Sequence, residues 1–137
     1  VFQDDGYTKE EHKMIFETRK IMDLPELGVC PTCVRVPVFN GHAESVTAEF
    51  ENEITVEQAS KALREGRGLF VQDEPAKNLY PTQIEISGSD ATCVGRIRKD
   101  PSAPNSLAFW CVADNLRKGA ATNAVQVAEI LSQHHLD

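Results

Sequence analysis

Two helix-start signals of the same kind divide this sequence and set the first constraint on its fold. Thr8 is followed three residues later by Glu11, and Thr55 is followed in the same way by Gln58. In such a capping box the threonine hydroxyl accepts a hydrogen bond from a helical N–H, while the glutamate or glutamine side chain reaches back to the threonine backbone. Helices are therefore expected after both signals, over residues 8–22 and 55–65.

The segments outside these helices predict β-strands. Valines alternate with other residues over 33–39, which favours a strand. The Asn40-Gly41 pair that follows favours a tight hairpin, because both central residues of a type I′ turn need positive φ. The returning strand would cover 42–50, so Arg35, His42 and Glu44 would project from one side of the hairpin. Further strands are expected over residues 69–71, 84–86, 91–98 and 106–113.

A last helix is expected over residues 115–134, where apolar side chains recur at helical spacing. Glycine inside a helix costs about 1 kcal/mol relative to alanine, so Gly119 is expected to permit a close approach of backbone or ligand. Residues 73–82 carry two prolines and little periodicity, which indicates a surface connection. The order helix, hairpin, helix, strands, helix predicts an α+β fold with a mixed, mainly antiparallel sheet covered by helices.

Composition narrows the possible partners. The 137 residues are 41% apolar and 26% charged, with a net charge of −7, which indicates a globular chain and argues against binding to a nucleic-acid backbone. No run approaches the roughly 18 consecutive apolar residues of a membrane span, and the start lacks the pattern of a signal peptide. A cytoplasmic protein with no membrane partner is expected. The first residue is not methionine, so we also expect the chain to be part of something longer.

The pattern of the four cysteines favours reduced structural thiols over a metal site or a redox pair. Cys30 and Cys33 have the two-residue spacing of metal knuckles and redox pairs, but a strand-like run follows Cys33 where a redox pair would open a helix. Cys93 and Cys111 stand alone, and the histidines show no matching pair spacing, so no metal site is expected. Metal binding and redox activity remain the alternatives.

Two small groups of polar residues are candidates for chemistry. Arg35 offers a planar fork that suits a carboxylate, and His42 has a side chain suited to proton transfer near neutral pH. Glu10 and Lys13 lie together along the edge of the first expected helix. Arg35 and His42 together could bind and deprotonate a small acid. The alternative is that all four are solvated surface residues with ordinary ion pairs.

Three motifs, in order along the chain, resemble aspartate-semialdehyde dehydrogenase. They are Asp5-Gly-Tyr-Thr-Lys-Glu-Glu-His-Lys-Met14 with Glu17-Thr-Arg-Lys20, then Cys33-Val-Arg-Val-Pro-Val with Gly41-His42, and Asp114-Asn-Leu-Arg-Lys-Gly-Ala-Ala-Thr-Asn-Ala124. The resemblance covers nearly the whole chain but only the later half of that enzyme. It implies the fold of a glyceraldehyde-3-phosphate dehydrogenase-like C-terminal domain.

The resemblance implies a reaction and a role for each candidate. Members of this family reduce aspartyl phosphate to aspartate semialdehyde with NADPH, on the route to lysine, threonine and methionine. A cysteine thiolate displaces phosphate to form a thioester, and hydride transfer then releases the aldehyde. By motif match, His42 would be the acid/base, Arg35 would hold the substrate carboxylate, Glu10 the amino group and Lys13 the phosphate. Asn115 would lie beside the nicotinamide of the cofactor, NADP.

Departures from the family pattern imply an incomplete active site. None of the four cysteines has the Asn-Cys-Ser/Thr-Thr context of the family's nucleophile, and the glycine-rich dinucleotide loop is missing. We therefore expect residues 1–113 to be a partial catalytic and dimerisation domain of a homodimer, inactive alone. Residues 114–137 would form a helix that packs on an absent nucleotide-binding domain, leaving its apolar stripe exposed here.

Two alternatives stay open beside this assignment. One is a non-catalytic dimerisation or ligand-binding module of the same fold. The other is a related acyl-phosphate reductase of another pathway. Glu10 helps to distinguish the two enzymes, because a substrate with a free amino group needs a carboxylate partner.

Overall fold

A computed structural model of the chain describes residues 1–134. The chain divides into two compact units, residues 1–37 and residues from Val38 onward. Each unit is described by itself.

The first unit is built on the helix that the first capping box predicts. Helix α1 covers Lys9–Met22, with Thr8 as its N-cap. The Glu11 N–H donates to the Thr8 hydroxyl at 3.2 Å, and the Thr8 N–H donates to Glu11 Oε2 at 2.6 Å. Asp23, in the left-handed conformation, ends the helix. The expected helix over 8–22 is therefore confirmed with its cap.

The predicted hairpin is wrong. Residues 33–39 form no strand, and strand β1, His42–Glu49, pairs antiparallel with β4, Ser106–Ala113, instead. Arg35, His42 and Glu44 consequently share no hairpin face. Gly41 does have the positive φ that the sequence signal requires, at +92°, but Asn40 and Gly41 hydrogen-bond to side chains at the end of β4 and do not close a turn between two strands.

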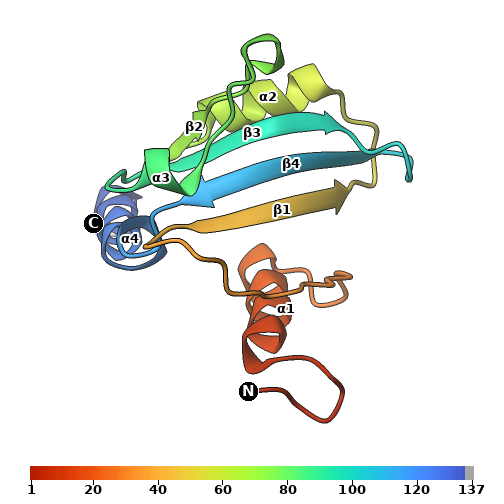
Figure 1. The fold of residues 1–137 in the computed structure, drawn as a ribbon, viewed down its shortest axis with the longest axis vertical. Helices are drawn as coiled ribbons and strands as arrows, with labels where there is room; N and C mark the ends of the chain where they lie inside the picture. The colour runs from red at the N-terminus through yellow and green to blue at the C-terminus, as the bar shows by residue number, and fades with distance from the viewer. Residues whose placement is uncertain (135–137) are drawn as a thin grey trace. The chain divides into compact units, whose positions relative to one another are not determined.

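The second unit is a four-stranded mixed sheet in the order β1-β4-β3-β2 (Figure 1). Strand β3, Thr92–Lys99, runs antiparallel to β4, and the short β2, Leu69–Val71, runs parallel to β3. The expected antiparallel pair near 91–98 and 106–113 is confirmed, as is the expected strand at 69–71. These elements confirm an α+β fold with a mixed, mainly antiparallel sheet.

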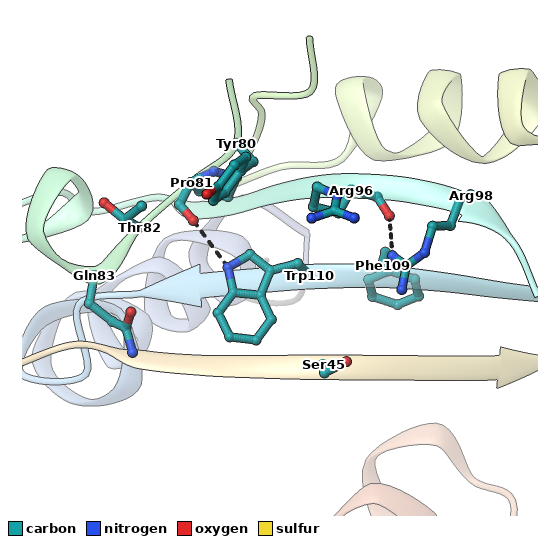
Figure 2. Close-up of a pocket in the computed structure, with 9 residues that line it drawn as sticks. All are labelled: Ser45, Tyr80, Pro81, Thr82, Gln83, Arg96, Arg98, Phe109 and Trp110. Atoms are coloured by element: carbon teal, nitrogen blue, oxygen red, sulfur yellow. Dashed lines mark hydrogen bonds between the residues drawn. The ribbon is translucent and has the colours of Figure 1, made fainter. Parts of the chain in front are cut away.

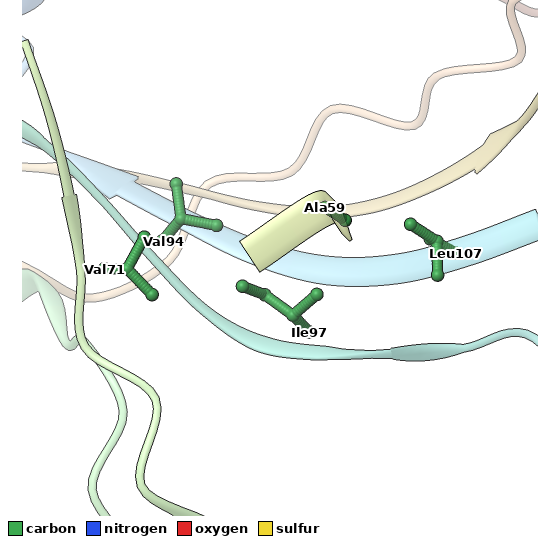
Figure 3. Close-up of a cluster of buried hydrophobic side chains, with 5 residues drawn as sticks. All are labelled: Ala59, Val71, Val94, Ile97 and Leu107. Carbon is green, nitrogen blue, oxygen red and sulfur yellow. The ribbon is translucent and has the colours of Figure 1, made fainter. Parts of the chain in front are cut away.

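Helix α2, Val56–Glu65, covers one face of this sheet and creates the larger core. Its N-cap Thr55 forms the predicted capping box with Gln58. Alternation along the strands directs every second side chain to the same face, so residues of three strands meet the helix there. The buried cluster consists of Ala59, Val71, Val94, Ile97 and Leu107 (Figure 3).

A smaller cluster lies where the other set of strand side chains projects. Cys93 and Val112 are directly paired across β3 and β4, and both pack with Ile86. Ile86 belongs to α3, Gln83–Ile86, so the expected strand over 84–86 is wrong. Thr82 caps this short helix, with the Glu85 N–H donating to the Thr82 hydroxyl at 3.4 Å.

Strand β3 carries a bulge. Gly95 pairs with Trp110, and Arg98 pairs with Ala108, so two residues of β3 lie opposite one residue of β4. Arg96 adopts a positive φ of 56° there. The carboxylate of Asp73 accepts from the Arg96 N–H at 3.0 Å and from the Ile97 N–H at 2.9 Å. These two bonds satisfy backbone groups that a bulge removes from the ladder.

The expected C-terminal helix is confirmed, but it begins with a different geometry. Residues Arg117–Ala121 form a π-helical turn, and α4 covers Thr122–His134. The apolar stripe is exposed as expected, with Leu116 at 67% and Val127 at 48% of full exposure. In residues 1–134, none of the helices has the length and hydrophobicity needed to cross a membrane. Residues 135–137 of the expected C-terminal segment lie outside the described residues.

Candidate active site

Glu10 and Lys13 lie on the surface of α1, and the structure brings them together. Lys13 Nζ is 3.3 Å from Glu10 Oε1, and both side chains are more than half exposed. An exposed ion pair of this kind contributes about 0–1 kcal/mol. The two charged groups can therefore separate readily when a charged ligand competes for either of them.

Arg35 lies in the irregular segment that leads out of the first unit, and its place depends on Glu11. The Cys33 N–H donates to Glu11 Oε1 at 2.8 Å, while the other oxygen of the same carboxylate serves the helix cap at Thr8. The N–H groups of Thr8 and Cys33 lower the pKa of Glu11. One buried carboxylate thus joins the start of α1 to the backbone two residues before Arg35. The capping box identified Glu11 only as a cap, and nothing in its spacing indicates the second contact.

The residue before His42 contacts the Asn115 side chain at one end of the sheet. His42 is the first residue of β1 and pairs with Ala113 near the end of β4. The N–H of Gly41 donates to Asn115 Oδ1 at 2.8 Å, although the two residues are 74 positions apart in the sequence. The candidate acid/base and the candidate cofactor amide therefore lie beside each other in the second unit. In Figure 1 this is the end of the sheet where α3 and α4 lie.

Asp114 is a buried residue beside this site, and the sequence does not mark it among the candidate site residues. It is 3% exposed, and its Oδ2 accepts from the Gly88 N–H at 2.8 Å and from Asn40 Nδ2 at 3.1 Å. Its Oδ1 accepts from the Leu116 N–H at 2.9 Å. The Gly88 hydrogen bond is the main reason that the pKa of Asp114 is lowered. The sequence signal that could have identified Asp114 is its position between the expected strand over 106–113 and the expected helix over 115–134.

The cysteines differ in their surroundings. Cys93 is buried and Cys111 is partly buried, and burial raises the pKa of both thiols, that of Cys111 to about 11. Cys30 is exposed, with its sulfur 3.7 Å from the Tyr7 hydroxyl. Thiolate is the reactive form, so Cys93 and Cys111 are poor nucleophiles. Within residues 1–134, no three side chains of the ligating types are grouped so that they could hold a metal ion.

A hollow of about 350 Å³ lies beside the sheet of the second unit, and Gln83, which lies against Gly41, is among the residues that line it. Trp110 forms part of its wall and donates from Nε1 to the Pro81 carbonyl at 3.0 Å (Figure 2). Arg96 lies 5.8 Å from the centre of the Tyr80 ring. None of the residues predicted to form the active site lines this hollow.

Comparison with known proteins identifies the family. Residues 1–118 match the family model described as "Semialdehyde dehydrogenase, dimerisation domain". The chain is 54% identical over 136 residues to an aspartate-semialdehyde dehydrogenase of Aquifex aeolicus, covering 99% of this chain and 40% of that protein. It is 49% identical to the Bacillus subtilis enzyme of the same name, covering 98% of this chain and 39% of that protein.

Solved structures give the same result. Aspartate semialdehyde dehydrogenase II of Vibrio cholerae, solved in complex with ASA, superposes with a TM-score of 0.91 at 47% identity, over 99% of this chain and 40% of that one. The Candida albicans enzyme, solved with NADP, gives a TM-score of 0.75 at 27% identity, over 92% of this chain and 43% of that one. The chain spans about 40% of the length of the relatives it matches. It belongs to the semialdehyde dehydrogenase dimerisation-domain family.

Proposed function

We propose that this chain supplies the acid/base, substrate-binding and nicotinamide-facing residues of an NADP-dependent aspartate-semialdehyde dehydrogenase, as the C-terminal portion of that enzyme. The observation that carries the proposal is the hydrogen bond from the N–H of Gly41, the residue before His42, to the Asn115 side chain. A residue that moves a proton and an amide that touches a cofactor have to lie close together, because both act on one substrate.

On the substrate side, the three charged candidates match the groups of aspartyl phosphate. The Arg35 guanidinium can hold the carboxylate with two parallel hydrogen bonds. The Glu10 carboxylate suits the substrate amino group, and the Lys13 ammonium suits the phosphate. The weak Glu10–Lys13 pair, at 3.3 Å, leaves each partner available to exchange the other for a substrate group.

His42 is well placed to exchange protons with a bound substrate. It is exposed at the start of β1, and its side chain makes no hydrogen bond with residues 38–134. An imidazole without a fixed partner in its own unit can accept a proton in one step and return it in the next. In the proposed reaction it carries the proton that is exchanged as the thioester forms and as the aldehyde is released.

Asn115 fits a contact with NADP, which supplies or accepts the hydride when bound. Its Oδ1 is occupied by the Gly41 N–H, and its NH₂ group has no partner among the described residues. A Cβ placed on nearby Gly119 would lie 3.6 Å from Asn115 Cβ, an ordinary contact, with no other side chain within 4 Å. Residues of this chain would hold the nicotinamide end of the cofactor, and the glycine-rich loop for its phosphates is absent from the sequence.

The proposal also requires that the nucleophilic cysteine and the nucleotide-binding domain come from residues outside this chain. Burial makes Cys93 and Cys111 poor nucleophiles, and neither Cys30 nor Cys33 has the sequence context of the family's nucleophile, which supports a nucleophilic cysteine outside these residues. The 137-residue chain alone would accordingly have no dehydrogenase activity. The dimerisation-domain match supports a homodimer, in which residues 1–113 belong to the shared domain and 114–137 pack on the nucleotide-binding domain. Its place would be the cytoplasm.

A phosphate-dependent assay tests the proposal. NADPH formation from aspartate semialdehyde, phosphate and NADP is measured with this chain alone and with the longer protein that includes it. The chain alone should give no turnover. In the longer protein, His42→Ala should lower kcat by about 10²–10⁴-fold, and Arg35→Ala should chiefly raise KM for aspartate semialdehyde.

His12→Ala is the matched control for the histidine, because His12 pairs with Asp5 at 2.9 Å and has no assigned role. Turnover by the chain alone, or equal effects of the two histidine variants, would refute the assignment. A longer protein that binds its ligands or dimerises without any turnover would favour the non-catalytic module. Turnover with a related semialdehyde that lacks the amino group, unchanged by Glu10→Gln, would favour the reductase of another pathway.

A further inference from the structure

The orientation of His42 has to come from its backbone. In residues 38–134 its side chain has no hydrogen-bond partner, and β1 is an edge strand with a neighbour on one side only. The first residue of an edge strand is prone to fray, since few contacts hold it. A proton donor in this position needs a second device to fix it, because a misplacement of about 1 Å can reduce the rate about 10²-fold.

The two residues before His42 are held by side chains from distant parts of the unit. Asn40 Nδ2 donates to Asp114 Oδ2 at 3.1 Å and to the Ser87 hydroxyl at 2.9 Å, and that hydroxyl donates back to Asn40 Oδ1 at 3.1 Å. Gly41 is buried and donates its N–H to Asn115. Both residues that lead into His42 are therefore held in place.

Asp114 connects these contacts. Its carboxylate binds Asn40, the N–H of Gly88 just beyond α3, and the N–H of Leu116 beyond Asn115. Its own carbonyl accepts from the N–H groups of the π-helical turn, at 3.2 Å from Arg117 and 2.8 Å from Lys118. A buried carboxylate is tolerated only when its oxygens are hydrogen-bonded, and here both are. One residue thus links Asn40, two residues before His42, to the turn that carries Asn115.

We propose that Asp114 is the positioning residue of this site, which fixes the place of His42 relative to Asn115 without touching the substrate. The inference rests on the proposed function only for the roles of His42 and Asn115. The part that concerns geometry involves residues of the second unit alone. It can be tested without an activity measurement.

The chemistry of the carboxylate makes one variant especially informative. Asp114→Asn keeps the size and shape of the side chain, but it replaces one acceptor oxygen with an NH₂ group. All three partners of the carboxylate are N–H donors, so at least one of them must then face the NH₂ group of the new side chain. The variant therefore loosens the connection while removing no packing volume.

Amide hydrogen exchange, measured by NMR on the full 137-residue chain, tests the geometric part. In Asp114→Asn the Gly41 N–H should exchange at least tenfold faster, while Cys111 and Val94 in the centre of the sheet should change less than twofold. Asp100→Asn is the matched control, because Asp100 accepts from Ser102 and Ser106 in and beside the β3–β4 loop. It should leave Gly41 unchanged.

Asn40→Ala provides a second variant in case Asp114→Asn does not fold. It removes one donor from Asp114 and leaves the other two, and it should also accelerate exchange at Gly41. Equal acceleration across all four strands in both variants would show a general stabilising role and overturn the inference. Unchanged exchange at Gly41 would overturn it as well.

Kinetics of the longer protein separate this inference from the proposed function. Asp114→Asn should lower kcat at least tenfold and change KM for aspartate semialdehyde less than twofold, since the residues proposed to bind substrate lie in the first unit. If exchange at Gly41 is faster in Asp114→Asn while His42→Ala stays fully active, the positioning role is supported and the proposed function is refuted. If His42→Ala loses activity while Asp114→Asn stays fully active, the proposed function is supported and the positioning role is refuted.

Discussion

Substitution of Gly41 should destabilise the second unit through two separate effects. Its φ of +92° is a conformation that residues with a side chain rarely adopt, and forcing one into the left-handed region costs about 1–2 kcal/mol. A Cβ at this position would also lie 3.1 Å from Gln83 Cβ and 3.5 Å from Gln83 Cα. Overpacking typically adds about 1–3 kcal/mol. Gly41→Ala should therefore lower the free energy of unfolding by about 2–5 kcal/mol.

Gly88→Ala separates the two effects. Gly88 has a similar φ of +84°, but a Cβ there would meet nothing within 4 Å. This variant should pay only the conformational penalty, about 1–2 kcal/mol. The difference between the two variants then measures the contact between Gly41 and Gln83 alone.

Urea unfolding followed by tryptophan fluorescence is the appropriate assay. Trp110 is the only tryptophan and lies on β4, so its signal reports the second unit. With a typical slope of about 1–3 kcal/mol per molar urea, a loss of about 3 kcal/mol shifts the midpoint by about 1–3 M. Equal midpoints for the two alanine variants would refute the packing argument. If both variants unfold at the same urea concentration as the wild type, the argument from φ is refuted as well.

Three further results are expected. Alkylation at pH 8 should label exposed Cys30 well before Cys111, whose pKa is raised to about 11 by burial, and equal labelling in mass spectra would contradict this order. Leu107→Ala should lower the free energy of unfolding by about 2–5 kcal/mol, because Leu107 is 1% exposed in the core, and a loss below 1 kcal/mol would contradict that placement. Hydrogen bonds from Arg117 and Thr122 lower the pKa of Asp90 from 3.8 to about 2, so its stabilising contribution is full above about pH 4 and is lost as the pH falls toward 2. Asp90→Asn should flatten that part of the pH profile of the urea midpoint, and an unchanged profile would contradict the pairing.

Local chemistry explains which parts of the fold could be predicted. The capping boxes at Thr8 and Thr55 depend on groups three residues apart, and both helices begin where expected. The same signal, Thr82 with Glu85, marks α3, but the alternating isoleucines at 84 and 86 favoured a strand. Over so few residues a strand period and a helix period fit equally well.

Pairing between distant segments explains what could not be predicted. Asn40-Gly41 carries a correct local requirement, positive φ at Gly41, but the choice of partner for β1 was decided by β4, more than fifty residues later in the chain. For the same reason no spacing argument could place Asn115 beside Gly41, from which it is 74 positions distant. The motif resemblance named both His42 and Asn115, and the link between them through Asp114 became visible only with the sheet assembled.

The bulge in β3 has a consequence for how this strand tolerates changes in length. Val94 and Ile97 both point into the core although they are three positions apart, and a regular strand would turn one of them outward. Removal of Arg96 would restore strict alternation, with Val94 and Ile97 inward and Arg98 outward. Strand β3 is therefore equivalent to a regular strand with one inserted residue, and the Asp73 carboxylate accepts from the N–H groups of Arg96 and Ile97 at the insertion. Related chains that lack the insertion should be free to vary at position 73, whereas chains that keep it should need an acceptor there.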